Sequence, residues 1–234
     1  MSVCIDGNNF SIIAYTSCNK YEGDDFEGAV YNTLATMLGK LKSKFSGDFY
    51  VCWDTRGGTT FRKELNSDYK ATRKPGMIDF SIINRTKSLY DDYGVRSINV
   101  PACEGDDALY VLCKCLRERK PQDVITIVSR DRDMLQIVQA GWANQIWDPV
   151  TKEAVPIPMY DIVKFKAIAG DTSDNIKGVK GIGKAGALKI LDGLRTLTES
   201  QQKEYEESLK LVDATLNPNF EKNYEFVKNM LSEM

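Results

Sequence analysis

Nine acidic side chains lie in five short clusters, and four of these clusters stand at an expected strand end or helix start. The nine residues are Asp6, Asp54, Glu104, Asp106, Asp107, Asp131, Asp133, Asp171 and Asp174. Carboxylates that follow neighbouring parallel strands meet at one edge of a sheet. Converging carboxylates cannot all stay ionised without a cation. Since oxygen-only ligands suit Mg²⁺ or Mn²⁺, the sequence predicts a divalent-metal site.

Short apolar stretches alternate with amphipathic ones over the first 150 residues. Strands are expected at residues 2–7, 48–53, 95–100, 123–128 and 144–148, and helices at 26–45, 79–93, 105–119 and from about 131. This alternation predicts an α/β fold, with a mostly parallel central sheet and helices on both faces. After Pro158 the pattern becomes all-helical, with helices expected at 159–170 and 184–194. We therefore divide the chain into residues 1–158 and 159–234.

Composition excludes several classes of chemistry. The chain has no histidine, which removes Ser-His-Asp and Cys-His catalysis and histidine-ligated zinc. Its six cysteines form no CxxC pair, so we expect reduced, buried thiols. No apolar stretch approaches the roughly 20 residues that cross a bilayer, and the first residues lack the features of a signal peptide. These features predict a cytoplasmic protein without a membrane partner.

Each acidic cluster also has an ordinary structural interpretation. An isolated Asp after a strand is usually a helix cap or a turn residue, and acids at a helix start interact favourably with its dipole. Three carboxyls within Glu104-Gly105-Asp106-Asp107 exceed what capping needs, and Asp171 and Asp174 are spaced to share one face of a helical turn. The metal hypothesis depends on all five clusters together.

A glycine-rich loop separates the two helices expected after Pro158. Its GIGKAG matches the GxGxxG dinucleotide pattern, but polar residues and not a strand precede it, so we reject that interpretation. The glycines would instead let backbone amides approach a phosphate, with lysines adding charge. The alternative is a plain turn with a solvated lysine face. The residues concerned are Lys177, Gly178, Lys180, Gly181, Ile182, Gly183 and Lys184.

A second basic tract lies near the middle of the chain. Residues 56–96 contain nine Lys or Arg against five Asp or Glu, within a chain of net charge −2. Alone, such a tract is more often a solvated surface. Beside a carboxylate cluster it could hold a phosphodiester and stack a base. The candidates are Arg62, Tyr69, Lys70, Arg73 and Lys74.

The order of the motifs resembles one family, the 5′ nucleases of the flap-endonuclease type. The similarity runs from Met1 to about Leu194, through DGNN, CWD, YKATR, EGDD, SRDRDM and GDTSDNIKGVKGIGKAGALKIL. The resemblance implies a PIN-like nuclease domain over residues 1–158, with an arch for single-stranded DNA at about 68–93. It also implies a DNA-binding subdomain of helix–hairpin–helix type over residues 159–234.

The same resemblance implies roles for individual residues. Asp6, Asp54, Glu104 and Asp106 would form a first metal site with Asp107 close by, and Asp131, Asp133, Asp171 and Asp174 a second. Lys70 would reach the scissile phosphate with Arg73 near it, and Tyr69 would stack on the terminal base. The glycine-rich loop would grip duplex DNA, in this family often with a bound K⁺.

The resemblance also implies the substrate and the setting. The expected partner is DNA with a 5′ end, flap or junction, or an RNA/DNA hybrid, cleaved by a monomer during replication or repair. The chain is short for the family, its last segment is acidic, and no polymerase segment follows. We therefore expect a stand-alone enzyme acting in a bacterial cell or a phage-infected host.

Two other classes of function remain open. A module that only recognises branched DNA would bind tightly without metal and without turnover. A PIN-type ribonuclease shares the acidic sheet edge, although a downstream glycine-rich helix–loop–helix is not expected of it. A phosphatase of the haloacid-dehalogenase type is excluded because Gly-Asn follows Asp6 and no DxDx[TV] motif is formed.

Overall fold

A six-stranded sheet forms the centre of the protein, whose computed structural model describes residues 1–72 and 76–234. Its strands are β1 (Ser2–Asp6), β2 (Asp48–Cys52), β3 (Arg96–Ile98), β4 (Ile125–Val128), β5 (Gln145–Asp148) and β6 (Glu153–Ala154). Their order is β3-β2-β1-β4-β5-β6. The first five run parallel, and β6 pairs antiparallel with β5.

The strand order reverses at the centre of the sheet. From β1 the chain moves outward to β2 and β3, then returns to place β4 on the other side of β1. Loops that leave the carboxyl ends of β1 and β4 therefore diverge, which opens a crevice at the point where ligands bind in parallel sheets. Asp6 ends β1, and Ser129 directly follows β4.

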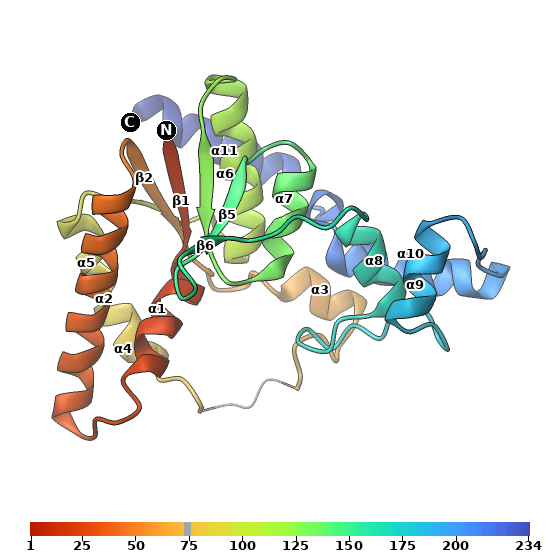
Figure 1. Ribbon diagram of the computed structural model, residues 1–234, viewed down its shortest axis with the longest axis horizontal. Coiled ribbons are helices and arrows are strands. Elements are labelled where there is room, and N and C mark those ends of the chain that lie inside the picture. Colours follow the sequence, from red (N-terminus) through yellow and green to blue (C-terminus); the bar gives the residue numbers. More distant parts are fainter. Residues whose placement is uncertain (73–75) are drawn as a thin grey trace.

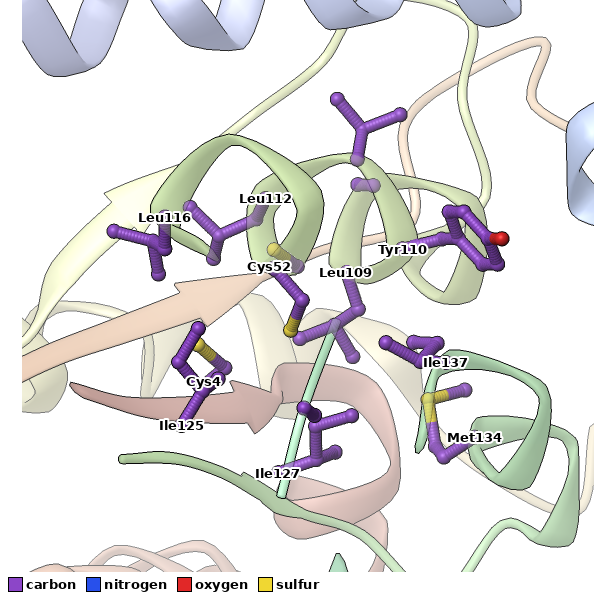
Figure 2. Close-up of a cluster of buried hydrophobic side chains, with 14 of the residues drawn as sticks. Cys4, Cys52, Leu109, Tyr110, Leu112, Leu116, Ile125, Ile127, Met134 and Ile137 are labelled. Atoms are coloured by element: carbon purple, nitrogen blue, oxygen red, sulfur yellow. The ribbon is translucent and has the colours of Figure 1, made fainter. Parts of the chain in front are cut away.

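Helices cover both faces of the sheet, as Figure 1 shows. One face carries α1 (Gly7–Ser17), α2 (Asp24–Lys44), α4 (Phe80–Arg85) and α5 (Ser88–Asp92), and the other carries α6 (Gly105–Arg119) and α7 (Leu135–Gln139). Alternate residues of β1 divide between two cores: Val3 and Ile5 pack toward α1 and α2, and Cys4 packs toward α6. Figure 2 shows Leu109, Leu112 and Leu116 of α6 above the sheet.

The remaining helices lie beside the carboxyl ends of the strands or on α6. The short helix α3 (Thr60–Leu65) follows β2, and the turn η1 (Arg132–Met134) precedes α7. Helices α8 (Ile162–Ala169), α9 (Lys184–Leu191) and α10 (Glu199–Val212) form a separate group at one end of the molecule (Figure 1). Then η2 (Ala214–Leu216) leads to α11 (Phe220–Glu233), whose Val227 and Leu231 pack with α6.

Most expected elements are present, and the differences have local causes. All five predicted strands exist, each within a few residues of its expected bounds. The predicted helix 79–93 is two helices, because Thr86 is buried and its hydroxyl donates to the carbonyl of Ile83 at the end of α4. The helix expected at 159–170 begins at Ile162, where Asp161 caps it by accepting from the amide of Lys164. Helices α1, α3, α10 and α11 were not anticipated individually.

Throughout residues 1–72 and 76–234, no helix is both long and apolar enough to span a lipid bilayer.

Candidate metal centre and nucleic-acid interface

Asp6 is held in place by neutral donors at the central strand end. It caps α1, where its Oδ1 accepts from the amide of Asn9 at 3.0 Å, and its Oδ2 accepts from Ser129 Oγ at 3.0 Å. Ser129 Oγ in turn accepts from the amide of Asp131. The serine therefore joins the ends of β1 and β4 and places Asp6 beside Asp131.

Asp54 follows β2 by two residues and reaches across to the start of α6. Its Oδ1 accepts from the amide of Gly105 at 2.6 Å, and its Oδ2 accepts from the side-chain amide of Asn8. Glycine at position 105 favours this close approach, because a Cβ there would make a tight contact of 3.1 Å with Asp54 Oδ1. The EGDD motif thus uses its glycine to bring Asp54 against the helix that carries three further acids.

The electrostatics of this edge are those of crowded carboxylates. Burial raises the pKa of Asp6 to about 7, and the nearby Asp131 and Asp54 raise it further. Burial also raises the pKa of Asp131 to about 6, with Asp106 and Asp174 adding to the effect, although its side chain still reaches solvent. These shifts place acids from all five clusters within electrostatic reach of one another. A bound dication would reverse both shifts.

Arg62 neutralises two of the acids on α6 from within the core. The guanidinium, from α3, donates to Asp107 at 2.7 and 2.8 Å and to Glu104 Oε2 at 2.6 Å. Asn217 donates to the same Asp107 oxygen at 2.9 Å. Arg62, Glu104 and Asp107 are each about 3% exposed. The predicted phosphate contact by Arg62 does not fit this structure, because the guanidinium is buried and its donors face carboxylates.

The three acids of EGDD differ in the contacts that they make, and so in how well they could bind a metal ion. One oxygen from each of Glu104, Asp106 and Asp107 lies within 4.8 Å of the others, which is a spacing that a metal ion could bridge. Both oxygens of Asp107 are nevertheless engaged by Arg62 and Asn217. Among the described residues, the amide of Asp107 is the only hydrogen-bond donor to Asp106, at its Oδ1. Asp106 is therefore the better ligand, and Asp107 anchors Arg62.

Lys70 lies beside the acids in a strained backbone conformation. It has a positive φ of 57°, which is uncommon for a residue with a side chain. Its amide donates to the carbonyl of Asp174 at 2.9 Å, and its ammonium contacts Glu104 and lies 4.0 Å from Asp174. Lys70 therefore lies next to the acids, and its contact with the scissile phosphate stays a prediction.

Tyr69 is buried beneath the acids. The ring is 2% exposed and packs with Ile176 and Leu211, while its hydroxyl donates to Glu104 and Asp174 at 3.2 Å each. The predicted stacking on a terminal base does not fit this arrangement, because no face of the ring is open. Of the other predicted residues of this tract, Arg73 and Lys74 lie outside the described residues.

Lys166 is a cation that sequence reasoning missed. It extends from α8 and contacts Asp133 of η1 and Asp171, whose Oδ2 lies 2.6 Å from its ammonium. Burial raises the pKa of Asp171, but Lys166 and Ser173 outweigh it and hold the pKa at about 2. Nothing in KAIAGD signals this ion pair, because the partner Asp133 is 33 residues away along the chain.

Asp106 of the first acid group meets three acids of the second group around one small cavity. This cavity, of about 10 Å³, is lined among others by Asp106, Asp133, Asp171, Asp174 and Lys166. Asp133 Oδ1 is a buried atom that accepts no directed hydrogen bond within the described part of the chain, although Lys166 lies against it. A buried carboxylate oxygen that already contacts an ammonium is suited to bind a cation. The donor set of carboxylate oxygens therefore fits one or more hard divalent ions.

The glycine-rich loop is shaped by its own backbone contacts. Gly170 and Gly178 have positive φ, and a Cβ on Gly178 would lie 2.3 Å from the amide nitrogen of Gly170. Asp171 and Ile176 exchange two backbone hydrogen bonds of 2.8 and 2.7 Å. The side chains of Asp171 and Asp174 thus come from a tight hairpin at the start of the loop.

The predicted phosphate-binding residues of the loop divide into two kinds. Lys177, Lys180, Gly181, Gly183 and Lys184 are exposed, Gly178 is partly exposed, and the amides that begin α9 have no side-chain cap. The side chain of Ile182 is buried with Val179 and Ala187, so only its backbone could meet a phosphate. The amide of Lys180 is already engaged, because it donates to Glu204 of α10 at 2.8 Å.

Comparison with known proteins relates this arrangement to one sequence family. The sequence profile of the 5′-3′ exonuclease N-terminal resolvase-like domain matches residues 1–167. A 5′-3′ exonuclease of Mycoplasmopsis pulmonis is 30% identical over 203 residues, 82% of this chain and 66% of the relative. The thermostable DNA polymerase I of Thermus thermophilus is 34% identical over 170 residues, 70% of this chain but 20% of the polymerase. The chain thus spans less than two thirds of these relatives.

Two solved structures share the whole fold. T5 5′-exonuclease with bound zinc has a TM-score of 0.72 at 19% identity, covering 98% of this chain and 99% of the other. A T5 flap endonuclease complex with DNA and metal ions has a TM-score of 0.68 at 17% identity, covering 100% and 99%. These likenesses confirm the predicted fold class, a mostly parallel, PIN-like sheet with helices on both faces.

Proposed function

Because the chain belongs to the family defined by the N-terminal resolvase-like domain of 5′-3′ exonucleases, we propose that it is a divalent-metal-dependent 5′ nuclease. Its reaction would be hydrolysis of DNA phosphodiesters at a 5′ end, flap or junction. The observation that carries this proposal is the meeting of acids from the start of α6, from η1 and from the α8–α9 loop around one small cavity. The strand-end acid Asp6 is linked to the neighbouring Asp131 through Ser129.

We assign the acids to two separate sets of metal ligands. Asp6, Asp54, Glu104 and Asp106 would hold a first ion, and Asp131, Asp133, Asp171 and Asp174 a second. Bound Mg²⁺ or Mn²⁺ would supply an activated water and stabilise charge on the reacting phosphate. A K⁺ ion at the glycine-rich loop remains a further prediction.

The protein's own residues would position the substrate. Asn8, Asn9 and Ser129 orient Asp54, Asp6 and the turn after β4 through hydrogen bonds, so that the acids need little rearrangement. Lys70 stands beside Glu104 and Asp174, where its ammonium could turn to the scissile phosphate. Arg73 is three residues further along the same tract and is proposed to assist it.

DNA would reach this centre from the side of the glycine-rich loop. The exposed Lys177, Lys180 and Lys184 and the uncapped start of α9 offer donors for backbone phosphates. Such contacts read the shape of the DNA and not its sequence. We further propose that residues 68–93 contact the single-stranded 5′ segment, and that the protein acts in the cytoplasm as a monomer.

A labelled substrate tests the activity directly. The protein would be incubated with a 5′-labelled flap duplex in Mg²⁺ and, in parallel, in Ca²⁺ or EDTA. We expect short 5′ products in Mg²⁺ only, and their length would distinguish cutting at the junction from cutting at the end. The double substitution Asp131→Asn and Asp133→Asn should abolish the products. Binding without cleavage in Mg²⁺ and Mn²⁺ would support a branched-DNA recognition module instead, and preference for an RNA 5′ strand would support a ribonuclease.

A further inference from the structure

Individual acids of the two sets differ in the cations that the protein itself brings to them, and in the first set it is Glu104 that is paired with Arg62 and Lys70. Within the described residues, Asp6 and Asp54 have only neutral hydrogen-bond donors and no ammonium or guanidinium within ion-pair distance. Asp133 and Asp171, by contrast, share the ammonium of Lys166. The second acid set therefore contains the positive charge of Lys166, which lies between two carboxylates that we propose as ligands of the second metal ion.

The position of Lys166 is built into the fold. Asp161 caps the helix that carries it, and Gly170, with φ of 81°, ends that helix. A Cβ on Gly170 would lie 2.7 Å from the carbonyl oxygen of Ile176, so the turn into Asp171 depends on glycine. Asp171 Oδ1 accepts from the amide and hydroxyl of Ser173, which leaves Oδ2 toward the lysine. Lys166 is thus directed at one oxygen of an oriented carboxylate.

The ammonium also joins two parts of the molecule. Asp133 belongs to η1 beside the sheet, whereas Lys166 and Asp171 belong to α8 and the following loop. The Lys166 side chain is 15% exposed, and those of Asp133 and Asp171 are 18% and 12% exposed. Charges at such partly buried positions are screened less than at the surface. The charges of Lys166, Asp133 and Asp171 therefore also act on any metal ion that binds nearby.

Resting on the nuclease function proposed above, we propose that Lys166 is a built-in counter-ion that competes with the second divalent ion for Asp133 and Asp171. The ammonium holds the second acid set together until a dication replaces it. The ammonium and a dication cannot contact the same carboxylate oxygens, and their like charges repel. Within the described residues, a dication at Asp6 and Asp54 meets no such competitor. Removing the Lys166 ammonium should therefore tighten the binding of the second ion.

Titration with Mn²⁺ tests this competition without any DNA. Free Mn²⁺ would be followed by electron paramagnetic resonance for the wild type, Lys166→Met and Lys164→Met. Lys164 is the matched control, because it is on the same helix but exposed and paired only with Asp161 at 3.5 Å. We expect Lys166→Met to tighten the weaker binding step by about 10-fold or more, and Lys164→Met to leave it within about 2-fold. Weaker or unchanged binding in a folded Lys166→Met variant would overturn the proposal.

A measurement on the wild type covers the case in which Lys166→Met does not fold. Reductive methylation followed by mass spectrometry would report how accessible each lysine is, with and without saturating Mg²⁺. We expect methylation of Lys166 to become several-fold faster in Mg²⁺ while that of Lys164 stays constant. Equal methylation of Lys166 in both conditions would contradict the competition.

The outcomes separate this inference from the nuclease proposal. If flap cleavage requires Mg²⁺ and two Mn²⁺ steps are present, but Lys166→Met changes neither step, only the role of Lys166 fails. If neither wild type nor variant binds a second ion, the two-ion centre fails and the competition fails with it.

Discussion

The acids at the strand ends and the acids beside α3 and α8 are the same residue types in opposite surroundings. Asp6 and Asp54 are oriented by amides and a hydroxyl, and burial raises the pKa of Asp6 to about 7. Asp107 and Asp171 are paired with Arg62 and Lys166, and the pKa of Asp171 is about 2. We call the first pair the amide-held acids and the second pair the cation-held acids.

The comparison separates two tasks that a cluster of carboxylates can perform. Cation-held acids are neutralised by the protein and contribute to its stability. Amide-held acids are positioned by neutral donors and have no counter-charge among the described residues, and burial makes ionising Asp6 unfavourable until a metal ion binds. This is the pattern expected of a functional site whose geometry is maintained at some expense of stability.

The largest expected effect comes from breaking the cation-held side. Arg62→Met would leave Glu104 and Asp107 buried without their partner, and would also remove the bond from Arg62 Nε to the carbonyl of Leu211. We expect a loss of about 3–5 kcal/mol in the free energy of unfolding, measured by urea denaturation. The control is Arg85→Met, which breaks an exposed pair with Glu27 and should lower the free energy of unfolding far less than Arg62→Met. Equal losses in both variants would contradict the comparison.

Removing the charge of an amide-held acid should raise the free energy of unfolding, whereas Arg62→Met should lower it. Asp6→Asn keeps an oxygen that can accept from the amide of Asn9 but removes a carboxylate that is unfavourable to ionise. In EDTA at pH 8 we expect a gain of about 1–3 kcal/mol in the free energy of unfolding. Cleavage in Mg²⁺ should fall at least about 100-fold. A variant that is destabilised in EDTA would show that Asp6 is a structural acid.

The pH dependence of stability sharpens the same contrast. A carboxyl with a raised folded-state pKa stabilises the protein fully below its unfolded value, and this contribution is lost as pH rises through the folded value. For Asp6 the loss runs from about pH 4 to above pH 7. In EDTA the melting temperature should therefore fall between pH 5 and 8. Saturating Mg²⁺ or Asp6→Asn should flatten the curve, and an unchanged slope in both would be evidence against this account.

Acid titration of the cation-held side has the reverse sign. Asp171 has a lowered pKa, so its contribution is present above about pH 4 and disappears as pH falls through about 2. We expect Asp171→Asn to lose stability at pH 7 and to differ little from the wild type near pH 2. The two unfolding curves, measured by circular dichroism, should converge at low pH. A constant difference across this range would exclude the ion pair with Lys166 as its cause.

The smallest expected effect concerns a group that touches acids of two clusters. Tyr69→Phe removes a hydroxyl that donates to Glu104 and Asp174 but keeps the buried ring. We expect a loss of about 1 kcal/mol in the free energy of unfolding. Affinity for a 5′ flap in Ca²⁺ should stay within about 2-fold for Tyr69→Phe. Tyr69→Leu removes the ring as well. If it weakened DNA binding without lowering the free energy of unfolding, stacking of Tyr69 on the terminal base would be supported after all.

The fold was largely predictable from the sequence because its signals are local. Each parallel strand is a short apolar run, and an acid or a motif marks the end of β1, β2 and β4. The helical periodicity of α6 is visible in the spacing of Ala108, Leu112 and Leu116. The glycines of the loop between α8 and α9 indicate a tight turn. These patterns could not predict that α11 packs on α6, because the apolar face of an amphipathic helix does not indicate which surface it will cover.

The candidate site was predictable in its acids but not in its cations. Strand ends bring Asp6, Asp54 and Asp131 to one edge by topology alone. Arg62 and Lys166 gave no such signal: a basic residue in a polar stretch has the same pattern whether it faces solvent or a buried carboxylate. Their roles follow from contacts with residues at least 33 positions away, except for the nearby Asp171. Long-range pairing of charges is therefore the part that the structure supplies.

The most direct test of the central claim is to locate divalent ions crystallographically. Crystals soaked in Mn²⁺ would be measured for anomalous scattering, which identifies the ion independently of the surrounding protein. We predict one strong peak in contact with carboxylate oxygens of Asp6 or Asp54, and a weaker one at Asp131, Asp133, Asp171 or Asp174 with the Lys166 ammonium moved away. Strong peaks elsewhere, with none at Asp6, Asp54 or Asp131, would contradict the assignment of the amide-held acids to the metal.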